Sequence, residues 1–406
     1  MFSKLSIRDL DTAGKTVFMR TDFNVPLNDR QEVTDDTRIR AALPSIQHLI
    51  DNGARLILAS HLGRPKGKVV FEMSLSPVAD RLAKLVDAPV RFARDCLGEE
   101  VESMISEMGE GEILLLENLR FHAEETDNEE AFAEQLASLA DIYVNDAFGT
   151  AHRAHASTEG VARKMETAAA GFLMEKELEY LGGLFDEPLR PCVALLGGAK
   201  ISGKIPVIKN LLEHVDSILI GGGMAFTFFK AMGLGVGNSI VDEELFDAAR
   251  SLIEKSREMN KEILLPVDLL IAPNMSADAE IRTVLPTDLP EGWMGLDIGP
   301  DTCELYSGRL SQAKTVFWNG PMGVFELKPF AQGTLSMARA LAEATGKGAR
   351  TVVGGGDSVA AVKQLGLGES LSHISTGGGA SLELVEGRDL PGVEALTEAK
   401  GVTHEP

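Results

Sequence analysis

The chain has 406 residues, 44% of them hydrophobic and 25% charged, which is typical of a globular protein and long enough to favour two domains. Its formal net charge of −22 excludes nucleic acid and anionic membranes as expected partners. No apolar run reaches the roughly 20 residues of a membrane span, and residues 1–10 contain no long apolar core, so we expect a cytoplasmic protein without a secretory signal.

The three cysteines, Cys96, Cys192 and Cys303, lie far apart and form no C-x-x-C pair. An odd number of separated cysteines suits a reducing compartment. This arrangement argues against a disulfide framework and against a zinc site.

Short apolar, β-branched runs recur along the chain between stretches with helical character. They span residues 16–19, 56–59, 113–116, 142–144, 193–196, 218–220, 263–266, 316–318, 352–353 and 373–375. This alternation predicts an α/β fold with parallel sheets flanked by helices. Ligands of such sheets bind beyond the carboxyl ends of the strands, so the residues after each run are the candidates for function.

In the first half of the chain, arginine and histidine follow these runs. The candidates are Arg38, His61, Arg64, Arg120 and Arg153. Guanidinium groups bind carboxylate or phosphate through two parallel hydrogen bonds, so several of them in so acidic a chain predict a specific anion pocket. Each arginine alone could instead be an exposed surface charge.

Two polar residues near the first run, Asp22 and Asn24, suit the recognition of hydroxyl groups, although turn chemistry would explain them equally well. Four of the eight histidines (His61, His122, His152 and His155) lie in this half. Their spacing does not match the metal motif H-E-x-x-H, so we expect them to form hydrogen bonds around an anion.

Residues 172–190 are predicted to connect two domains. Met174, Leu178 and Leu181 recur at helical spacing, and Gly182 and Gly183 follow them. We interpret this stretch as a hinge helix between a domain at 1–171 and a domain at 191–381. The alternative is one more surface helix of the first domain. The last ten residues are polar and are expected to fray.

The second half offers glycine and lysine. Residues 191–204 combine an apolar run, Gly197-Gly198, and two lysines at helical spacing, Lys200 and Lys204, which favours a phosphate site at a helix start. The stretch is not a P-loop, because Ile205 stands where that motif needs Ser or Thr for magnesium.

Two further glycine turns, 354–358 and 377–381, follow apolar runs, and the first contains Asp357, which is suited to Mg²⁺. Together they favour a nucleotide as ligand. A dinucleotide site is less suitable, because residues 221–226 lack the last glycine of the G-x-G-x-x-G fingerprint.

The motifs together resemble those of the phosphoglycerate kinases, in the family's order and over nearly the whole chain. They are TDFNVP at 21–26, SHLGRPKG at 60–67, ENLRF at 117–121, NDAFGTAHR at 145–153, LGGAK at 196–200, WNGPMGVFE at 318–326, GGGDS at 354–358 and GGGAS at 377–381. The resemblance implies reversible phosphoryl transfer between 1,3-bisphosphoglycerate with MgADP and 3-phosphoglycerate with MgATP. It also implies two similar Rossmann-like domains, with residues 382–406 packing back on the first.

The resemblance carries over three sets of residues. The acid substrate site falls on Asp22, Phe23, Asn24, Arg38, His61, Leu62, Gly63, Arg64, Arg120 and Arg153. The nucleotide site falls on Gly197, Lys200, Lys204, Gly221, Gly222, Asn319, Glu326, Gly355, Gly356, Asp357 and Ser358, with Asp357 nearest the metal. The catalytic set is Arg38, Lys200, Gly355 and Gly378. Gly203 and Ser358 depart from the residues more common in the family, and neither change removes a charge.

These expectations give a mechanism without a covalent intermediate, because the nucleophile is a carboxylate that is already ionised at pH 7. We expect direct in-line transfer after hinge closure, by a monomer. The alternative is another ATP-dependent kinase that acts on a small phosphorylated carboxylic acid. A nicotinamide-dependent dehydrogenase and a non-catalytic binding protein are the rivals from other classes; the first would need the missing fingerprint, and the second would not need the charged residues.

Overall fold

The chain folds into two compact units, and it passes from one unit to the other at two points. A computed structural model describes residues 3–184 and 188–399. One unit comprises Met1–Glu179 with Asp389–Pro406, and the other comprises Tyr180–Arg388. Residues 185–187 of the predicted connector and 400–406 of the terminus lie outside the described residues.

Local hydrogen bonds hold the segments next to these divisions on one unit or the other. Helix α7 (Phe172–Gly182) begins on the first unit, because the amides of Leu173 and Met174 donate to Asp146 Oδ1 at 2.9 and 3.1 Å. At the other end, Asn210 Nδ2 donates to the Val385 carbonyl at 2.9 Å, which holds the end of helix α14 (Gly379–Val385) on the second unit.

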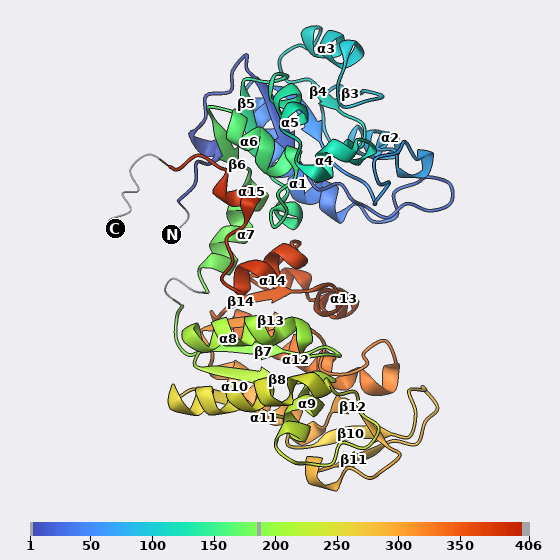
Figure 1. Cartoon of the computed structure of the whole chain (residues 1–406), viewed down its shortest axis with the longest axis vertical. Coiled ribbons are helices and arrows are strands. Elements are labelled where there is room, and N and C mark those ends of the chain that lie inside the picture. Colours follow the sequence, from blue (N-terminus) through green and yellow to red (C-terminus); the bar gives the residue numbers. More distant parts are fainter. Residues whose placement is uncertain (1–2, 185–187, 400–406) are drawn as a thin grey trace. The chain divides into compact units, whose positions relative to one another are not determined.

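The first unit is built on a six-stranded parallel sheet in the order β3-β4-β2-β1-β5-β6 (Figure 1). Its strands are β1 (Thr16–Arg20), β2 (Arg55–Ala59), β3 (Val90–Phe92), β4 (Ile113–Leu115), β5 (Ile142–Asn145) and β6 (Ala168–Ala170). Its helices are α1 (Thr37–Asp51), α2 (Ser76–Leu82), α3 (Glu99–Ser106), α4 (Ala123–Asp127), α5 (Glu130–Ala137), α6 (Val161–Lys164) and α15 (Pro391–Glu394). Every residue of β1, β4 and β5 is buried, so the sheet forms the centre of this core.

The register of this sheet aligns the carboxyl ends of three neighbouring strands. Arg20 at the end of β1 pairs with Ala59 of β2 on one side and with Asn145 of β5 on the other. The chain direction across the sheet reverses between β1 and β5, and such a reversal is where parallel sheets bind ligands. The segments that leave these strands are therefore brought to one edge.

The C-terminal segment completes the first unit. The Leu5 amide donates to the Thr397 carbonyl at 2.7 Å, and the Thr397 amide donates to the Ala168 carbonyl at 2.9 Å. Asn145 Nδ2 donates to the Gly392 carbonyl at 3.1 Å, so this segment also supports the end of β5.

The second unit contains a second six-stranded parallel sheet, in the order β15-β14-β13-β7-β8-β9. Its strands are β7 (Cys192–Leu196), β8 (Ser217–Ile220), β9 (Glu262–Leu264), β13 (Thr315–Asn319), β14 (Arg350–Gly354) and β15 (His373–Ile374). Its other helices are α8 (Ile205–His214), α9 (Met224–Ala231), α10 (Phe246–Glu258), α11 (Pro300–Gln312), α12 (Gln332–Gly346) and α13 (Gly356–Gln364). When only the six strands of this sheet are numbered along the chain, their order is that of the Rossmann fold, 3-2-1-4-5-6. The order reverses between β7 and β13.

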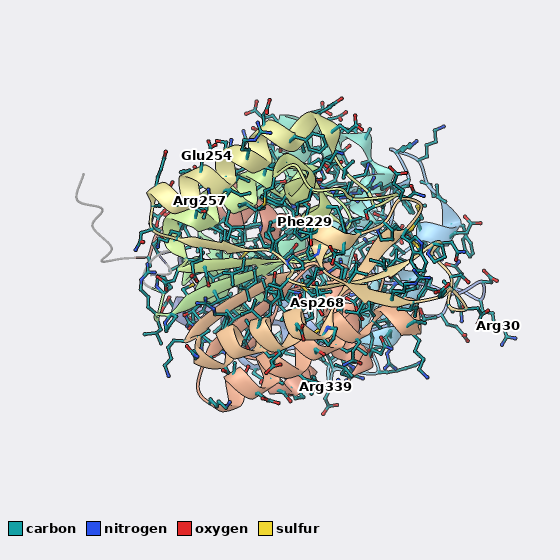
Figure 2. All side chains as sticks on the ribbon, turned by 90° about the horizontal axis from the view of Figure 1, so that it is seen from below. Arg30, Phe229, Glu254, Arg257, Asp268 and Arg339 are labelled. Atoms are coloured by element: carbon teal, nitrogen blue, oxygen red, sulfur yellow. The ribbon has the colours of Figure 1, made fainter. Side chains whose placement is uncertain are left out.

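A three-stranded antiparallel sheet, which the sequence did not predict, extends this unit. It consists of β10 (Leu269–Ala272), β11 (Arg282–Val284) and β12 (Met294–Ile298), in the order β11-β10-β12. Figure 2 shows Glu254 and Arg257 on the outside of α10, whereas Phe229 and Asp268 lie among the packed elements; only 4% and 3% of these two residues are exposed. Asp268 accepts hydrogen bonds from the Asp301 and Thr302 amides and so caps α11.

All ten predicted apolar runs fall on strands of the two parallel sheets, which confirms the predicted α/β class. One local prediction was wrong: Lys200 and Lys204 do not lie in a helix. Lys200 is in a loop, Ser202–Lys204 is a 3-10 turn, and α8 begins at Ile205. Pro206 lies in the first turn of α8, where its missing N–H costs nothing, and this fixes the helix start.

Candidate active site

In the first unit, the Arg38 side chain is held next to the end of β1. Arg38 lies in the first turn of α1, and its Nη1 donates to Asp22 Oδ2 at 2.5 Å. Its side chain remains 38% exposed, whereas that of Asp22 is 11% exposed. The pair therefore fixes the direction of the guanidinium group and leaves part of it open to an incoming anion.

The loop after β2 is tied to the loop after β1. Asn24 Oδ1 accepts from the Gly63 amide at 2.9 Å, and Ser60 Oγ accepts from the Phe23 amide at 2.8 Å. Phe23 and Leu62 are buried, so these two predicted substrate residues anchor the loops in the core. Arg64, on the same loop, is exposed.

A buried arginine that the sequence-derived set omitted lies at the centre of this edge. Arg20 is fully buried; its Nε donates to Ser157 Oγ at 2.8 Å, and its Nη2 lies 3.2 Å from His61 Nδ1. Ser157 in turn donates to Glu125 Oε1 at 2.6 Å. Arg20 ends a strand that is otherwise apolar, and a charge at the end of a buried strand was the signal available in the sequence.

Arg120 has buried donors that no protein group satisfies. Its Nη1 donates to the Gly63 carbonyl at 2.9 Å, whereas Nε and Nη2 have no hydrogen-bond partner among the described residues. Burial first, and then the charges of Arg20 and Arg153, lower the pKa of Arg120 to about 10. Because unpaired buried donors are costly, an anion is the natural partner of these two nitrogens.

Two histidines at this edge, His61 and His155, are neutral. Burial, followed by the charge of Arg20, lowers the pKa of His61 well below its usual value. Burial, followed by the charges of Arg120, Arg20 and Arg153, lowers the pKa of His155 to about 3. They can therefore donate or accept hydrogen bonds but add no charge, and the positive charge comes from arginines.

The first unit thus gathers more cations than anions at one edge of its sheet. Its cations are Arg20, Arg38, Arg120 and Arg153, and the carboxylates among them are Asp22 and Glu125. Such an excess in a protein of net charge −22 is suited to a multiply charged anion.

In the second unit, the glycines after β7 and β8 pack against the turn after β13. The Gly197 and Gly198 amides donate to the carbonyls of Asn319 and Pro321 at 3.0 and 2.8 Å, and the Gly222 amide donates to the Met322 carbonyl at 2.9 Å. A Cβ on Gly197 would lie 2.1 Å from the Pro321 carbonyl oxygen. Gly197, Gly221 and Gly222 therefore have a packing role that stands beside the predicted contact with a nucleotide.

Lys204 is a half-buried cation of this unit. Its Nζ donates to Asn319 Oδ1, and burial lowers its pKa to about 8, which the charge of Asp357 partly opposes. Lys200 is exposed on the loop between Gly198 and the 3-10 turn. The two lysines thus differ in environment, although their spacing in the sequence predicted the same role for both.

The glycine turn after β14 opens helix α13. Gly355 precedes the helix with φ +88°, a conformation that favours glycine, and its α-carbon face lies against Asn319. Ser358 Oγ accepts from the Gly320 amide at 2.6 Å, which joins this turn to the one after β13. Asn319 Nδ2 is buried and has no hydrogen-bond partner among the described residues.

Asp357 is exposed in the first turn of α13, next to the free amides of its N-terminus. Mg²⁺ is commonly held by one or two carboxylates together with substrate phosphates, so an exposed carboxylate beside a phosphate site fits the expected ion. Gly378 precedes the seven-residue helix α14 with φ +52°, and Glu326 is exposed in the segment after β13.

The first unit therefore gathers arginines at one edge of its sheet, and the second places glycines and lysines at the strand reversal of a Rossmann-ordered sheet. A fold and two sites of this kind define an α/β phosphotransferase. None of the helices among the described residues is long and apolar enough to cross a membrane.

Comparisons with known proteins identify the family. The sequence model described as "Phosphoglycerate kinase" matches residues 7–388. A phosphoglycerate kinase of Chlorobium limicola is 57% identical over 395 residues, which cover 97% of this chain and 100% of that protein. A cytosolic phosphoglycerate kinase of Nicotiana tabacum is 56% identical over 97% of this chain and 98% of its own length.

A solved structure agrees. The phosphoglycerate kinase of Coxiella burnetii superimposes with a TM-score of 0.89 at 41% sequence identity, covering 97% of this chain and 98% of that one. The chain belongs to the phosphoglycerate kinase family. It is an enzyme, a kinase with the activity for which the family is named, and the resemblance seen in the motifs is confirmed.

Proposed function

We propose that the chain reversibly transfers a phosphoryl group between the acyl phosphate of 1,3-bisphosphoglycerate and MgADP, giving 3-phosphoglycerate and MgATP. The observation that carries this proposal most directly is Arg120, whose buried Nε and Nη2 have no partner among the described residues. Its neighbours Arg20 and Arg153 are also cationic, so the site needs an anion with several oxygens.

The acid substrate belongs to the first unit in this proposal. Arg120 and Arg153, with Arg64 from the exposed loop, would bind its phosphate, while Asp22 and Asn24 accept hydrogen bonds from its hydroxyl group. His61 is neutral and held by Arg20, so it offers a hydrogen bond of fixed direction. Phe23, Leu62 and Gly63 shape the two loops.

The nucleotide belongs to the second unit. Its phosphates would take hydrogen bonds from the free amides at the start of α13, at Gly355, Gly356 and Ser358, and charge from Lys200 and Lys204. The packed glycines Gly197, Gly221 and Gly222 let the backbone approach the nucleotide, Asn319 Nδ2 provides a further donor, and Glu326 lies at the rim. Asp357 would hold Mg²⁺, which neutralises charge on the phosphates.

Transfer itself needs positioning and charge stabilisation, since the carboxylate nucleophile is ionised and needs no base. We propose that Arg38 and Lys200 stabilise the charge on the transferring group, with the helix starts at Gly355 and Gly378 as further donors. Direct transfer between sites on different units requires the units to approach during the reaction, with α7 as the hinge. Closure would also exclude water and so prevent hydrolysis.

We further propose that the enzyme is a monomer in the cytoplasm and that its reaction is a step of glycolysis or gluconeogenesis. One chain supplies both half-sites, so no second copy is needed. One of the similar proteins is named as cytosolic.

The test is ATP- and Mg²⁺-dependent phosphorylation of 3-phosphoglycerate, coupled to reduction of the acyl phosphate product. We expect turnover within the range of about 1–10³ s⁻¹ that is usual for enzymes. Binding of ATP without turnover on 3-phosphoglycerate would contradict the proposal. It would point to a different small phosphorylated carboxylic acid as the substrate of the arginine pocket.

A further inference from the structure

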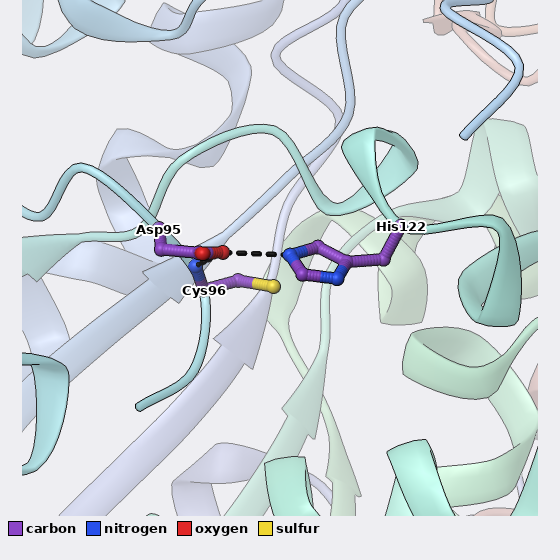
Figure 3. A group of neighbouring side chains, drawn as sticks. All are labelled: Asp95, Cys96 and His122. Carbon is purple, nitrogen blue, oxygen red and sulfur yellow. Dashed lines mark hydrogen bonds and ion pairs between the residues drawn. The ribbon is translucent and has the colours of Figure 1, made fainter. Parts of the chain in front are cut away.

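Three potential metal ligands of different chemistry meet at the carboxyl edge of the first unit's sheet. Asp95, Cys96 and His122 each bring one ligand atom, and these atoms all lie within 4.8 Å of one another. Figure 3 shows the Cys96 sulfur and the Asp95 carboxylate on the same side of the His122 imidazole ring, with the carboxylate in contact with a ring nitrogen. The three residues are not part of the substrate or nucleotide sets described above.

The two segments that carry these residues are fixed by neighbouring strands. Asp95 and Cys96 follow β3, and His122 follows the 3-10 turn Leu119–Phe121 that comes after β4. Strands β3 and β4 are paired, and the Ala93 and Glu117 amides donate to the carbonyls of Leu115 and Asp95 at 2.9 and 3.4 Å. The separation of Cys96 and His122 in the sequence concealed this cluster, which is why cysteine spacing argued against a zinc site.

Hydrogen bonds and packing hold the side chains in place before any ion arrives. His122 Nε2 lies 2.6 Å from Asp95 Oδ1, which also accepts from the Cys96 amide at 2.7 Å. The His122 ring packs on Phe132 with a centroid separation of 5.4 Å. Ligands held in this way lose little freedom on binding.

We propose that Asp95, Cys96 and His122 form a binding site for a divalent transition-metal ion of the zinc class. Thiolate, imidazole and carboxylate are the ligands that Zn²⁺ prefers, and three protein ligands leave a fourth position for water. Binding releases the thiol proton of Cys96 to solvent, and His122 ligates the ion through Nε2 as the neutral tautomer, with its proton on Nδ1.

This ion is distinct from the Mg²⁺ of the nucleotide. Mg²⁺ requires oxygen ligands in octahedral geometry, whereas sulfur and imidazole nitrogen select softer ions. The side chains of Asp95 and His122 are 55% and 31% exposed, so an ion can reach the cluster from solvent, while the thiol is supplied from the buried side.

Two other uses of Cys96 fit the structure less well. A disulfide within this unit is excluded by the sequence, because Cys192 and Cys303 both belong to the second unit. A nucleophilic role would need a thiolate that a substrate can reach, but Cys96 is fully buried.

The site would act on the segment that carries part of the acid pocket. Arg120 lies in the 3-10 turn just before His122, and Glu125, which binds Ser157, lies in the helix that follows. His122 lies between these two residues, so an ion bound to it restrains the segment that joins Arg120 to Glu125.

The experiment uses the full-length protein, freed of metal by a chelator and then titrated with Co²⁺. We expect one equivalent to bind with a thiolate-to-cobalt charge-transfer absorption in the near ultraviolet, and Zn²⁺ to displace it. Cys96→Ser should abolish the absorption. Asp95→Asn and His122→Gln, at partly exposed positions that folding tolerates, should each weaken Co²⁺ binding by at least about tenfold.

The matched control is Cys303→Ser, which removes a partly buried thiol from the second unit and should leave the absorption unchanged. Circular dichroism establishes that each variant is folded. No saturable absorption, or an absorption that survives Cys96→Ser, would overturn the proposal. So would unchanged Co²⁺ affinity in both folded surface variants, and that result would leave the Asp95–His122 contact as an ordinary ion pair.

Discussion

In the proposed assignment, the two units bind anions by different physical means. The first uses charged and polar side chains near the ends of buried strands. Arg20 contacts His61, Arg38 binds Asp22, and Asn24 binds the Gly63 amide across the loops. The second uses backbone, with glycines packed so closely that a Cβ on Gly197 or Gly222 would overlap neighbouring atoms.

The difference follows from the two ligands. A small acid must be distinguished by the positions of its carboxylate, hydroxyl and phosphate, and guanidinium groups at fixed angles provide that. Nucleotide phosphates need many donors at close range, which helix starts and glycine turns provide without side chains. The first site should therefore be sensitive to loss of charge, and the second to added volume.

The largest effect is expected at Arg38. Arg38→Ala removes the cation proposed to stabilise the transferring phosphoryl group and should lower kcat by about 10³-fold or more. Steady-state kinetics measures this directly. Arg40→Ala is the control, because Arg40 lies in the same helix turn but binds Asp36 at the surface, and it should change kcat little. A loss below tenfold in Arg38→Ala would remove this residue from the catalytic role.

Arg120 tests binding rather than catalysis. Arg120→Met keeps an unbranched, mostly apolar side chain but removes the guanidinium group, with its two unpartnered buried donors and its Nη1 bond to the Gly63 carbonyl. Charge-assisted hydrogen bonds contribute about 1.5–3 kcal/mol, so KM for 3-phosphoglycerate should rise by roughly 10- to 150-fold. KM for ATP should stay within about twofold. An equal rise in both constants would show that Arg120 does not serve the acid site specifically.

Gly197 tests the backbone-built site. Gly197→Ala places a Cβ 2.1 Å from the Pro321 carbonyl oxygen and should destabilise the second unit by about 1–3 kcal/mol or more. Gly203→Ala meets no atom within 4 Å and is the matched control, with an expected change within about 0.5 kcal/mol. Both tryptophans, Trp293 and Trp318, lie in the second unit, so urea unfolding followed by their fluorescence reports on this unit. Equal unfolding midpoints for the two variants would contradict the packing role.

The smallest effect is a pH dependence at Lys204. Its pKa is lowered to about 8 by burial, so the amine is charged below this pH and loses its charge as the pH rises through it. Affinity for ADP without metal should therefore fall by up to about tenfold per pH unit above pH 8. Lys204→Met should bind more weakly at pH 7 and lose this dependence. Calorimetry at several pH values decides; the same slope in both proteins would show that Lys204 does not contact the phosphates.

The sequence predicted the parallel strands well where residues are β-branched and buried, and poorly elsewhere. Strand β6 is three alanines, and β3 is half-buried with Arg91 at its centre, so neither carries a continuous apolar, β-branched signal. The start of α8 was misplaced because lysine spacing was given more weight than Pro206.

Candidate site residues could be selected from the sequence where they closely follow strands, as Asp22, His61 and Asp357 do. Partners that the fold brings together from distant positions were not: the contacts of Arg20 with Ser157, of Lys204 with Asn319, and of Cys96 with His122 depend on the order of the strands. Local patterns give residue types and strand ends, whereas pairing across a sheet depends on tertiary contacts.

The most direct test of the division of labour is calorimetric binding of 3-phosphoglycerate and of ADP to Arg120→Met and Lys204→Met at pH 7. We predict that Arg120→Met loses affinity for 3-phosphoglycerate and keeps it for ADP, and that Lys204→Met shows the reverse. If either folded variant lost affinity for both ligands to the same extent, the assignment of the acid to the first unit and the nucleotide to the second would be contradicted.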